Sequence, residues 1–252
     1  FSPAELMPGA RSVVVCGVSY KNDTSLGYGD TAVPKVASYA RSGDYHVAVK
    51  EMLYETAARL GLKEDGTGFR AFTDTAPLLE KRLACEAGLG FIGRNTLLVS
   101  PRYGSFLLLG ELVVDVPVDT YDRPYEGIGC GACRRCVEHC PAGALTGEGL
   151  DARRCISRLT VEPHPERVPA LAQRIGASTA GWIFGCDDCQ NVCPYNLRAP
   201  FFANPRFRPL FSPADMPACR WLEMTQAEFD ARFGATPMAR SGLARIKELL
   251  RR

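Results

Sequence analysis

Two groups of closely spaced cysteines are the strongest indication of a functional site in this sequence. The first group reads GCGACRRCVEHCP, with the spacing C-x2-C-x2-C-x3-C-P, and the second reads GCDDCQNVCP, with the spacing C-x2-C-x3-C-P. In bacterial ferredoxins, a run of the first kind binds one 4Fe-4S cluster through three cysteines, and its fourth cysteine binds a second cluster. The sequence therefore predicts two 4Fe-4S clusters in a redox enzyme that receives electrons.

The same crossing rule assigns ligands to each predicted cluster. The first cluster takes the first three cysteines of the first group and the last cysteine of the second group, Cys193. The second cluster is then one thiolate short, and the nearest unused thiol is Cys155 in DARRCISRLT. The predicted ligands are Cys130, Cys133, Cys136 and Cys193 for the first cluster, and Cys140, Cys155, Cys186 and Cys189 for the second.

A four-thiolate zinc site is the alternative, because zinc also binds paired C-x2-C motifs. The triple spacing and the prolines that follow Cys140 and Cys193 favour clusters, since proline fixes the backbone and removes an amide donor at a cluster turn. The remaining cysteines, Cys16, Cys85 and Cys219, are interpreted as small buried apolar residues. Clustered rather than scattered cysteines indicate metal binding and a reducing compartment.

Composition indicates an ordinary folded globular protein. The chain has 252 residues, of which 46% are hydrophobic and 23% are charged. No stretch approaches the roughly 18–20 apolar residues that a membrane helix needs. The longest candidate, residues 106–114, contains Glu111 and is interpreted as a strand. We therefore expect no membrane association and a cytoplasmic location.

The net charge of +2 is unevenly distributed. Residues 198–252 contain ten Lys or Arg and five Asp or Glu, a balance of +5, whereas the rest of the chain has 20 basic and 23 acidic residues, a balance of −3. This last segment is the better place for a polyanion. The alternative is a solvated face, because no block of like charges occurs.

Hydrophobic patterning predicts an α+β fold in three parts. We expect a first α+β domain over residues 1–122, a ferredoxin-like two-cluster domain over residues 123–197, and a basic, mostly helical segment over residues 198–252. The predicted strands span residues 13–20, 69–74, 95–100 and 105–115, and the predicted helices span residues 45–60, 77–87 and 241–252. The turn PRYG joins the last two strands, with glycine supplying a positive φ.

The segment GLGFIG matches the glycine pattern G-x-G-x-x-G of dinucleotide-binding sites. Here, however, a predicted helix precedes the glycines and a strand follows them, which reverses the strand–turn–helix order that directs helix amides at a pyrophosphate. We therefore reject a nucleotide site and interpret the glycines as a tight return of the backbone.

Asp74, in FTDTAPLLEK, has two interpretations. It follows a predicted strand and precedes a predicted helix with Pro77 in its first turn, so Asp74 or Thr75 could cap that helix. A carboxyl group at the end of a strand is also well placed to donate a proton to a ligand. Composition leaves both interpretations open.

Taken together, the motifs resemble those of the epoxyqueuosine reductase family. The motifs are GDYHVAVK, TDTAPLLEK, EAGLGFIGRNTLL, YGSFLLLGEL, the ferredoxin run, DARRCISRLT and GWIFGCDDCQNVCPYN. The resemblance covers essentially the whole chain and implies a cobalamin-dependent iron–sulfur enzyme that reduces epoxyqueuosine to queuosine at the wobble position of tRNA. It also implies that Asp74 is the general acid. Our hypothesis is that burial next to an apolar ligand keeps Asp74 protonated.

The resemblance carries over further cofactor contacts. Ala37, Leu98 and Leu109 match positions that touch cobalamin through backbone and apolar contacts, although core packing is an alternative for each. Ser157 and Asp187 match positions on the side of the cofactor that faces the second cluster, although both could cap local turns.

The chain also departs from related proteins. Compared with the fullest family members, it lacks the usual stretch before the first strand and a helical-repeat extension at the other end. The motif D-x-H-x-x-G of other corrinoid enzymes is incomplete, because Asp44 and His46 are followed by Val49 in place of glycine. Its absence fits a cofactor with no protein histidine below the cobalt.

Partners and rival functions follow from the same interpretation. We expect a monomer that binds the anticodon loop of tRNA and receives electrons from a ferredoxin or flavodoxin. One alternative is a corrinoid iron–sulfur reductase, similar to a reductive dehalogenase, that acts on a small molecule. Another is an electron carrier with clusters but no stoichiometric cobalamin.

Overall fold

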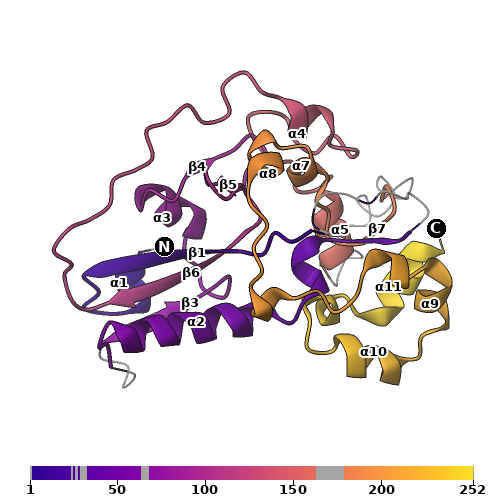
Figure 1. Cartoon of the computed structure of the whole chain (residues 1–252), viewed down its shortest axis with the longest axis horizontal. Helices are drawn as coiled ribbons and strands as arrows, with labels where there is room; N and C mark the ends of the chain where they lie inside the picture. The colour runs from indigo at the N-terminus through magenta and orange to yellow at the C-terminus, as the bar shows by residue number, and fades with distance from the viewer. Residues whose placement is uncertain are drawn as a thin grey trace.

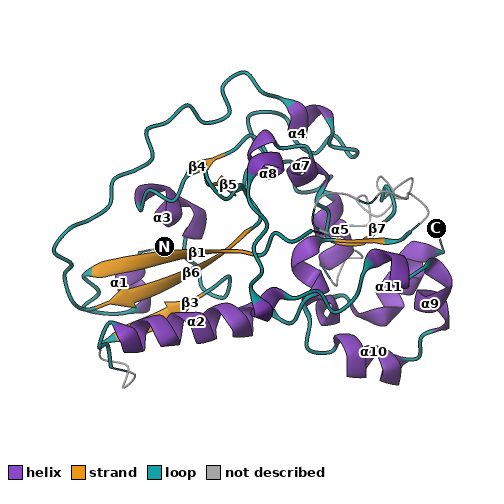
Figure 2. Cartoon of the chain, in the orientation of Figure 1, coloured by secondary structure: helices purple, strands orange, loops and turns teal. Residues whose placement is uncertain are grey.

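The computed structural model describes residues 2–23, 25, 28, 33–63, 68–162 and 179–251 of the chain. Within them, strands and short helices alternate in the first half, and helices predominate after the cysteine groups (Figure 2). The strands are β1 (Ser12–Ser19), β2 (Lys35–Val36), β3 (Phe69–Phe72), β4 (Phe91–Ile92), β5 (Leu98–Val99), β6 (Leu107–Val114) and β7 (Trp182–Phe184). The α-helices are α1 (Pro3–Leu6), α2 (Tyr45–Arg59), α3 (Glu80–Glu86), α4 (Arg135–Glu138), α5 (Ile156–Val161), α7 (Asp188–Asn191), α8 (Pro194–Arg198), α9 (Ala218–Glu223), α10 (Gln226–Phe233) and α11 (Gly242–Leu250), and the 3-10 helices are η1 (Ser38–Arg41), η3 (Pro205–Phe207), η4 (Pro213–Asp215) and η5 (Pro237–Arg240).

An antiparallel sheet in the order β1–β6–β3 forms the frame of the first half. Helices α2 and α3 lie on opposite sides of this sheet in Figure 1. Side chains alternate between the two faces of a strand, and β6 shows the alternation clearly. Leu108 and Leu112 pack in the same core as Val49 and Leu53 of α2, and both of these α2 side chains also approach Gly110. The opposite face of β6, which includes Glu111, lies toward α3.

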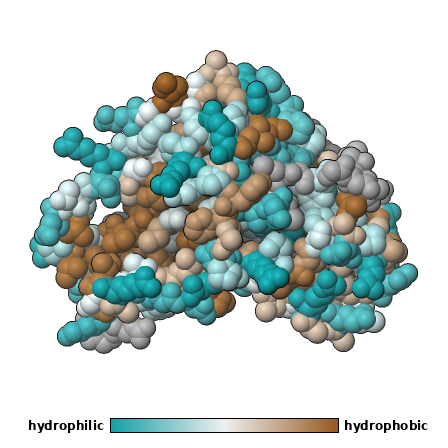
Figure 3. Space-filling view, viewed as in Figure 1, coloured by the Kyte–Doolittle hydropathy of each residue, from teal (hydrophilic) through white to brown (hydrophobic). Residues whose placement is uncertain are grey.

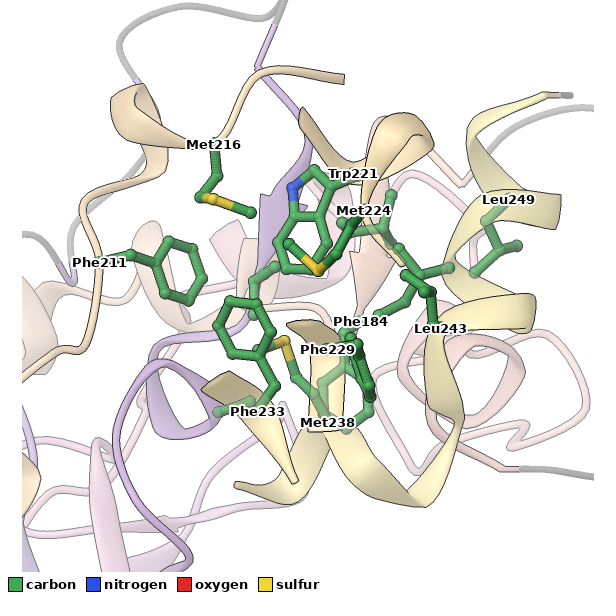
Figure 4. Packing of buried hydrophobic residues seen from close by; sticks show 14 residues of the cluster. Phe184, Phe211, Met216, Trp221, Met224, Phe229, Phe233, Met238, Leu243 and Leu249 are labelled. Atoms are coloured by element: carbon green, nitrogen blue, oxygen red, sulfur yellow. The ribbon is translucent and has the colours of Figure 1, made fainter. Parts of the chain in front are cut away.

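A second core joins the cysteine region to the end of the chain. Strands β2 and β7 pair in parallel, and Ile183 and Phe184 of β7 pack against the helices of the last segment. Figure 4 shows the aromatic and methionine side chains of this core, in which Trp221 stacks on Phe233 with ring centroids 5.2 Å apart. Val36 of β2 belongs to the same core, so packing crosses the expected domain boundaries, and the three-part division remains a prediction.

The surface is mixed rather than uniformly polar. On the face seen in Figure 3, apolar residues gather over the region of the three-stranded sheet, and elsewhere they alternate with polar residues. Within the described ranges, we find no helix of the length and hydrophobicity that crossing a membrane requires.

The expected elements are present, with shifted ends and one difference in pairing. The predicted strand at residues 95–100 shortens to β5, which pairs with β4 rather than with β6. The predicted helix at residues 77–87 begins only at Glu80, and Leu79 occupies its N-cap without a side-chain bond. Neither Asp74 nor Thr75 therefore caps α3, which corrects the structural interpretation of Asp74.

A buried asparagine connects the turn before β6 to the cysteine region. Asn196 is fully buried, and its Oδ1 accepts a hydrogen bond from the Ser105 amide at 2.5 Å. Its Nδ2 donates to Ser105 Oγ at 2.9 Å and to the Gln190 carbonyl at 2.8 Å. The adjacent Gly104 has φ +71°, and a Cβ there would lie 2.1 Å from Asn196 Oδ1. Only glycine fits this junction without displacing the asparagine.

Replacing Gly104 with alanine should lower the free energy of unfolding by about 1–3 kcal/mol, because the new Cβ is strained at a positive φ and collides with Asn196. Chemical denaturation followed by circular dichroism measures the change. Gly149→Ala is the matched control, since a Cβ at Gly149 meets no atom within 4 Å. Equal stabilities of the two variants would contradict the proposed role of this contact.

Candidate active site

A cavity of about 870 Å³ lies between the sheet domain and the cysteine region. Asp74 and residues 107–109 of β6 contribute one part of its lining, and Cys140, Cys155 and residues 186–190 contribute another. Gly234 and residues 236, 237, 239 and 240 of the last segment complete it. Its volume is in the range of sites for small organic ligands and cofactors. All three expected parts of the chain therefore line one cavity.

Asp74 lies in the loop between β3 and α3 and reaches the cavity from its sheet side. Its backbone is in the left-handed region, with φ 49°, and its amide donates to Glu80 Oε1 at 2.5 Å. The neighbouring Thr73 anchors the loop to β6 by donating from Oγ1 to the Leu109 carbonyl at 2.7 Å. Aspartate tolerates this backbone region better than most residues do. The loop thus holds one carboxyl group in a defined position at the cavity.

Two residues at the start of α2 surround the Asp74 carboxylate. Tyr45 donates its hydroxyl to Asp74 Oδ2 at 2.5 Å, and burial, together with this bond, raises the pKa of Tyr45. The ring of His46 lies with Nε2 3.9 Å from the same oxygen, and its Nδ1 is 2.7 Å from Oδ1 of Asp44, the N-cap of α2. A tyrosine and a histidine that face one carboxylate form a hydrogen-bonding group suited to proton transfer.

The expectation that Asp74 is buried is wrong for the protein alone. The side chain of Asp74 is 66% exposed, whereas that of His46 is 33% exposed. Desolvation raises the pKa of a carboxyl group only when water is excluded from it. The protein positions Asp74, and a ligand in the cavity would have to exclude the water.

The four thiols predicted for the first cluster lie close to one another. Burial raises the pKa of Cys136, and the nearby Cys130 and Cys193 raise it further. Burial also raises the pKa of Cys193, with Cys130 and Cys133 among its neighbours. Arg94 donates its backbone amide to Cys130 Sγ at 3.4 Å, which brings the loop after β4 to this site.

The thiols predicted for the second cluster form a neighbouring group. Burial raises the pKa of Cys189 most, followed by Asp187, and Cys155 and Cys140 act in the same direction. Burial likewise raises the pKa of Cys186, and Cys189 is among the residues that increase this effect. Buried thiols with raised pKa values stay protonated unless a metal centre binds them as thiolates. Their environment therefore fits a bound cluster.

The two groups of thiols adjoin each other, because Cys136 of the first group also raises the pKa of Cys189 in the second. The four thiols of the second group all line the cavity: Cys140, Cys155, Cys186 and Cys189. In the described residues, no three His, Cys, Asp or Glu side chains converge on a point that suits a single metal ion. The cluster assignment depends instead on which thiols are neighbours and on the family match below.

Of the remaining residues predicted to contact the cofactor, some line the cavity and others are buried behind its lining. Leu109, Ser157 and Asp187 line the cavity. Ala37 and Leu98 are buried behind its lining, with 1% and 4% of their surface exposed. Ala37 precedes the 3-10 helix η1, and its amide donates to the Phe184 carbonyl at 2.8 Å, so it secures β2 to β7. The five cofactor contacts remain predictions.

Asp187 is held rigidly between the two halves of the molecule. Its carboxylate accepts hydrogen bonds from the Ser38 amide at 2.7 Å and from Gln190 Nε2 at 3.0 Å. Burial raises its pKa, and the Ser38 hydrogen bond and the charge of Arg41 oppose that shift. The segment between the predicted ligands Cys186 and Cys189 is thus connected to η1, next to Ala37.

Sequence reasoning did not identify several polar residues of the site. Tyr45, Glu80 and Arg240 line the cavity, and Arg240 donates to Glu162 at 2.9 Å. His46 was considered only as part of an incomplete corrinoid motif. The polar residues GDYH at the start of a predicted helix could have indicated Tyr45 and His46 as site residues. Their role becomes visible only with Asp74, which is distant in sequence. Cys219, expected to be buried, is exposed.

An α+β domain with an acidic residue at a ligand cavity, joined to two adjacent groups of four cysteines, defines an iron–sulfur protein with a cofactor-sized site. Two family models match the chain. The model described as a 4Fe-4S double cluster binding domain matches residues 129–196, and the model described as epoxyqueuosine reductase QueG, DUF1730, matches residues 1–75.

Curated relatives identify the family. An epoxyqueuosine reductase of Pseudomonas aeruginosa is 39% identical over 248 residues, which cover 96% of this chain and 67% of that protein. Another from Cyclobacterium marinum is 37% identical over 241 residues, or 95% of this chain and 74% of that protein. The chain belongs to the epoxyqueuosine reductase family. It spans about two thirds of the length of the relatives it matches.

Solved structures agree with this assignment. A selenomethionine-labelled epoxyqueuosine reductase superposes with a TM-score of 0.83 at 28% identity, covering 99% of this chain and 66% of that one. An epoxyqueuosine reductase with an epoxyqueuosine-modified tRNA-Tyr stem loop gives a TM-score of 0.81 at 29% identity, covering 99% and 65%. A Bacillus subtilis epoxyqueuosine reductase whose catalytic aspartate loop has swung out of the active site gives 0.80 at 28% identity, covering 99% and 65%.

Replacing Cys155 with alanine should reduce the iron bound after anaerobic reconstitution by up to half, because the second cluster loses one of four thiolates. Iron and sulfide analysis, with the visible absorption of the clusters, measures this loss. Cys85→Ala is the control, since Cys85 lies on α3 and belongs to neither cysteine group. A full iron content in Cys155→Ala would show that this residue is not a ligand.

Proposed function

We propose that this chain reduces epoxyqueuosine to queuosine in tRNA, using cobalamin and two 4Fe-4S clusters. The observation that carries the proposal is the single cavity that has Asp74 on its sheet side and the thiols of the second cluster on its other side. A proton donor and an electron source would then act on the same ligand. Family membership supports this substrate, and the related structure with an epoxyqueuosine-modified stem loop supports a tRNA partner.

The residues present fit a large, flat and partly apolar cofactor such as cobalamin. Leu107, Leu108 and Leu109 offer apolar contacts, and Ser157 and Asp187 lie on the cluster side. Leu109, Ser157 and Asp187 would contact the cofactor directly, whereas Ala37 and Leu98 would support the surrounding backbone. When bound, cobalamin would supply nucleophilic low-valent cobalt chemistry, which protein side chains cannot provide.

Asp74 would act as the general acid. Its carboxyl group would donate a proton to the oxygen that leaves the substrate ring, and the Tyr45 hydroxyl at 2.5 Å would hold it in position. A cofactor and a substrate that fill the cavity would exclude water from Asp74 and favour its protonated form. The bound ligands, rather than protein atoms, would thus exclude water from Asp74.

Electrons would enter at the first cluster from a ferredoxin or flavodoxin. A second cavity of about 440 Å³ adjoins this region and is lined by Arg135, His139 and Leu197, among others. Arg135 adjoins Cys136 and Val192 adjoins Cys193, both predicted ligands of the first cluster, so an acidic donor could approach that cluster here. Electrons would then pass from the first cluster to the second, whose thiols line the main cavity.

The basic last segment would contribute to tRNA binding by a monomeric, cytoplasmic enzyme. Arg240 lies at the cavity, where it could reach a phosphate of an anticodon loop. Several cations of this segment already have acidic partners: Arg206 is 2.5 Å from Glu55, and Arg240 itself is 2.9 Å from Glu162, a partner it would exchange for the phosphate. The contribution to phosphate binding therefore comes from a subset of the ten basic residues rather than from the whole segment.

Replacing Asp74 with asparagine should abolish turnover of epoxyqueuosine-modified tRNA, by about 100-fold or more, while cobalamin stays bound. Asparagine keeps the size of the side chain but has no acidic proton. Nucleoside mass spectrometry measures the queuosine formed, and absorption spectroscopy measures the bound cobalamin. Asp230→Asn on α10 provides the control, because Asp230 does not line the cavity. Unchanged turnover in Asp74→Asn would eliminate Asp74 as the acid.

A further inference from the structure

Glu111 is a carboxyl group in the interior of the sheet domain. It lies in the middle of β6, the central strand, opposite Val15 of β1 and Phe72 of β3, and none of its surface is exposed. It interrupts the otherwise apolar strand LLLGELVV. An ionised carboxylate without partners is among the least favourable groups to bury. Its presence therefore requires a physical explanation.

The groups that face Glu111 do not supply a positive charge. Neither of its side-chain oxygens meets a donor in the described part of the chain. The nearest interacting group is the carboxyl group of Glu80 on α3, which carries no donor unless it is protonated, and Asp74 contributes further negative charge. The charge of Glu111 also raises the pKa of Cys16 on β1. His46 lies near Glu80 rather than near Glu111. Glu111 therefore faces carboxyl groups and a thiol rather than a cation.

Two carboxyl groups can form a hydrogen bond only if one of them carries a proton. Burial, followed by the neighbouring Glu80, raises the pKa of Glu111 to about 9. Burial also raises the pKa of Glu80, although the Asp74 amide opposes that shift by donating to Glu80 Oε1. The pair is therefore stable with one proton and unfavourable with none.

The pair connects the sheet interior to the cavity. Glu80 lines the cavity, whereas Glu111 lies behind it, and the Asp74 amide is 2.5 Å from Glu80 Oε1. Removing the oxygen of an epoxide as water consumes two electrons and two protons and leaves an alkene. The clusters can deliver both electrons, but Asp74 can donate one proton before it must be reprotonated. The reaction thus needs a source for its second proton.

We propose that Glu111 and Glu80 share one proton and that this pair supplies the second proton of the reduction. This inference rests on the proposed function. In the balanced sequence, Asp74 gives one proton to the leaving oxygen, the Glu80–Glu111 pair gives the other through Glu80, and water departs. The doubly ionised pair is unfavourable in the protein interior, so it takes a proton from solvent through the cavity before the next turnover.

The test replaces Glu111 with glutamine in the protein that contains both clusters and cobalamin. Glutamine preserves the shape and donates a hydrogen bond to Glu80, but it holds no transferable proton. We expect turnover to fall by about 100-fold, the range of a lost proton-transfer step, while the KM for the modified stem loop changes less than about twofold. The wild-type turnover should also fall as the pH rises toward 9, and the variant should lack this dependence.

A second readout does not depend on turnover. Infrared spectroscopy near neutral pH should show the carbonyl band of a protonated, buried carboxyl group in the wild-type protein, and Glu111→Gln should lack it. Glu86→Gln is the matched control, because Glu86 lies on α3 but is exposed and pairs with Arg82 at 2.5 Å. It should retain the band, the turnover and the pH profile.

The outcomes separate this inference from the proposed function. Wild-type-like turnover in Glu111→Gln, or no such band in the wild-type protein, would overturn the shared-proton proposal while leaving the substrate assignment intact. A wild-type protein that forms no queuosine would overturn the proposed function and, with it, the role of the pair as a proton source. The infrared band would still establish whether the two glutamates share a proton.

The pH dependence of the free energy of unfolding offers a third test, because the raised pKa of Glu111 fixes its direction. The folded pKa of Glu111 is raised to about 9, above its unfolded value, so its contribution to stability is full below about pH 4.3 and is lost as the pH rises through 9. The free energy of unfolding should therefore decrease between about pH 6 and pH 9. Urea titrations should show a smaller decrease for Glu111→Gln, and an equal decrease would contradict the raised pKa.

Discussion

The buried amide of Asn196 is the interaction on which the arrangement of the site depends most. It binds Ser105 at the start of the central strand and the Gln190 carbonyl in the cysteine region, and Ser105 Oγ also bonds Gln190 at 2.9 Å. Asn196 follows Cys193 by three residues, so the same helix turn carries a predicted cluster ligand. Together with the hydrogen bond from the Ser38 amide to Asp187, this junction holds the cysteine region against the sheet domain.

As a consequence, thiols and carboxyl groups lie on opposite sides of one cavity. Thiols on one side suit electron transfer, and the carboxyl groups of Asp74 and Glu80 on the other side suit proton transfer. Keeping them apart avoids placing anionic carboxylates next to anionic clusters, which would make both less favourable. A flat cofactor between them could receive electrons from one side while the substrate receives protons from the other. Asp187 and Asp188 are exceptions on the thiol side. Asp187 accepts hydrogen bonds from Ser38 and Gln190, and Asp188 accepts one from Trp182 Nε1 at 2.9 Å.

The chemistry of this chain is readable from local sequence where the ligands lie close together in the chain. The spacing of Cys130 to Cys140 is local, and residues 129–196 match a 4Fe-4S double cluster domain. The α+β class and the approximate positions of the strands also follow from local patterns. The pairing of β5 with β4 rather than with β6 does not, because pairing depends on contacts between distant segments.

The residues proposed to transfer protons were harder to predict for the same reason. Tyr45 and Asp74 are 29 residues apart, and their hydrogen bond forms only when α2 and the loop after β3 meet at the sheet. Glu111 did carry a local signal, a lone carboxyl group in an apolar strand, but the sequence could not show that Glu80 faces it. Burial of Asp74 was expected from its hypothesised role as a proton donor, whereas 66% of that side chain is exposed in the structure.

The central claim is that one cavity unites the electron and proton sources for reduction of a tRNA nucleoside. The most direct test is anaerobic turnover of the chain, reconstituted with iron, sulfide and cobalamin, on an epoxyqueuosine-modified stem loop with a chemical reductant. Nucleoside mass spectrometry should detect queuosine, formed only when cobalamin and reductant are both present. No queuosine from protein with full iron content and bound cobalamin would contradict the account.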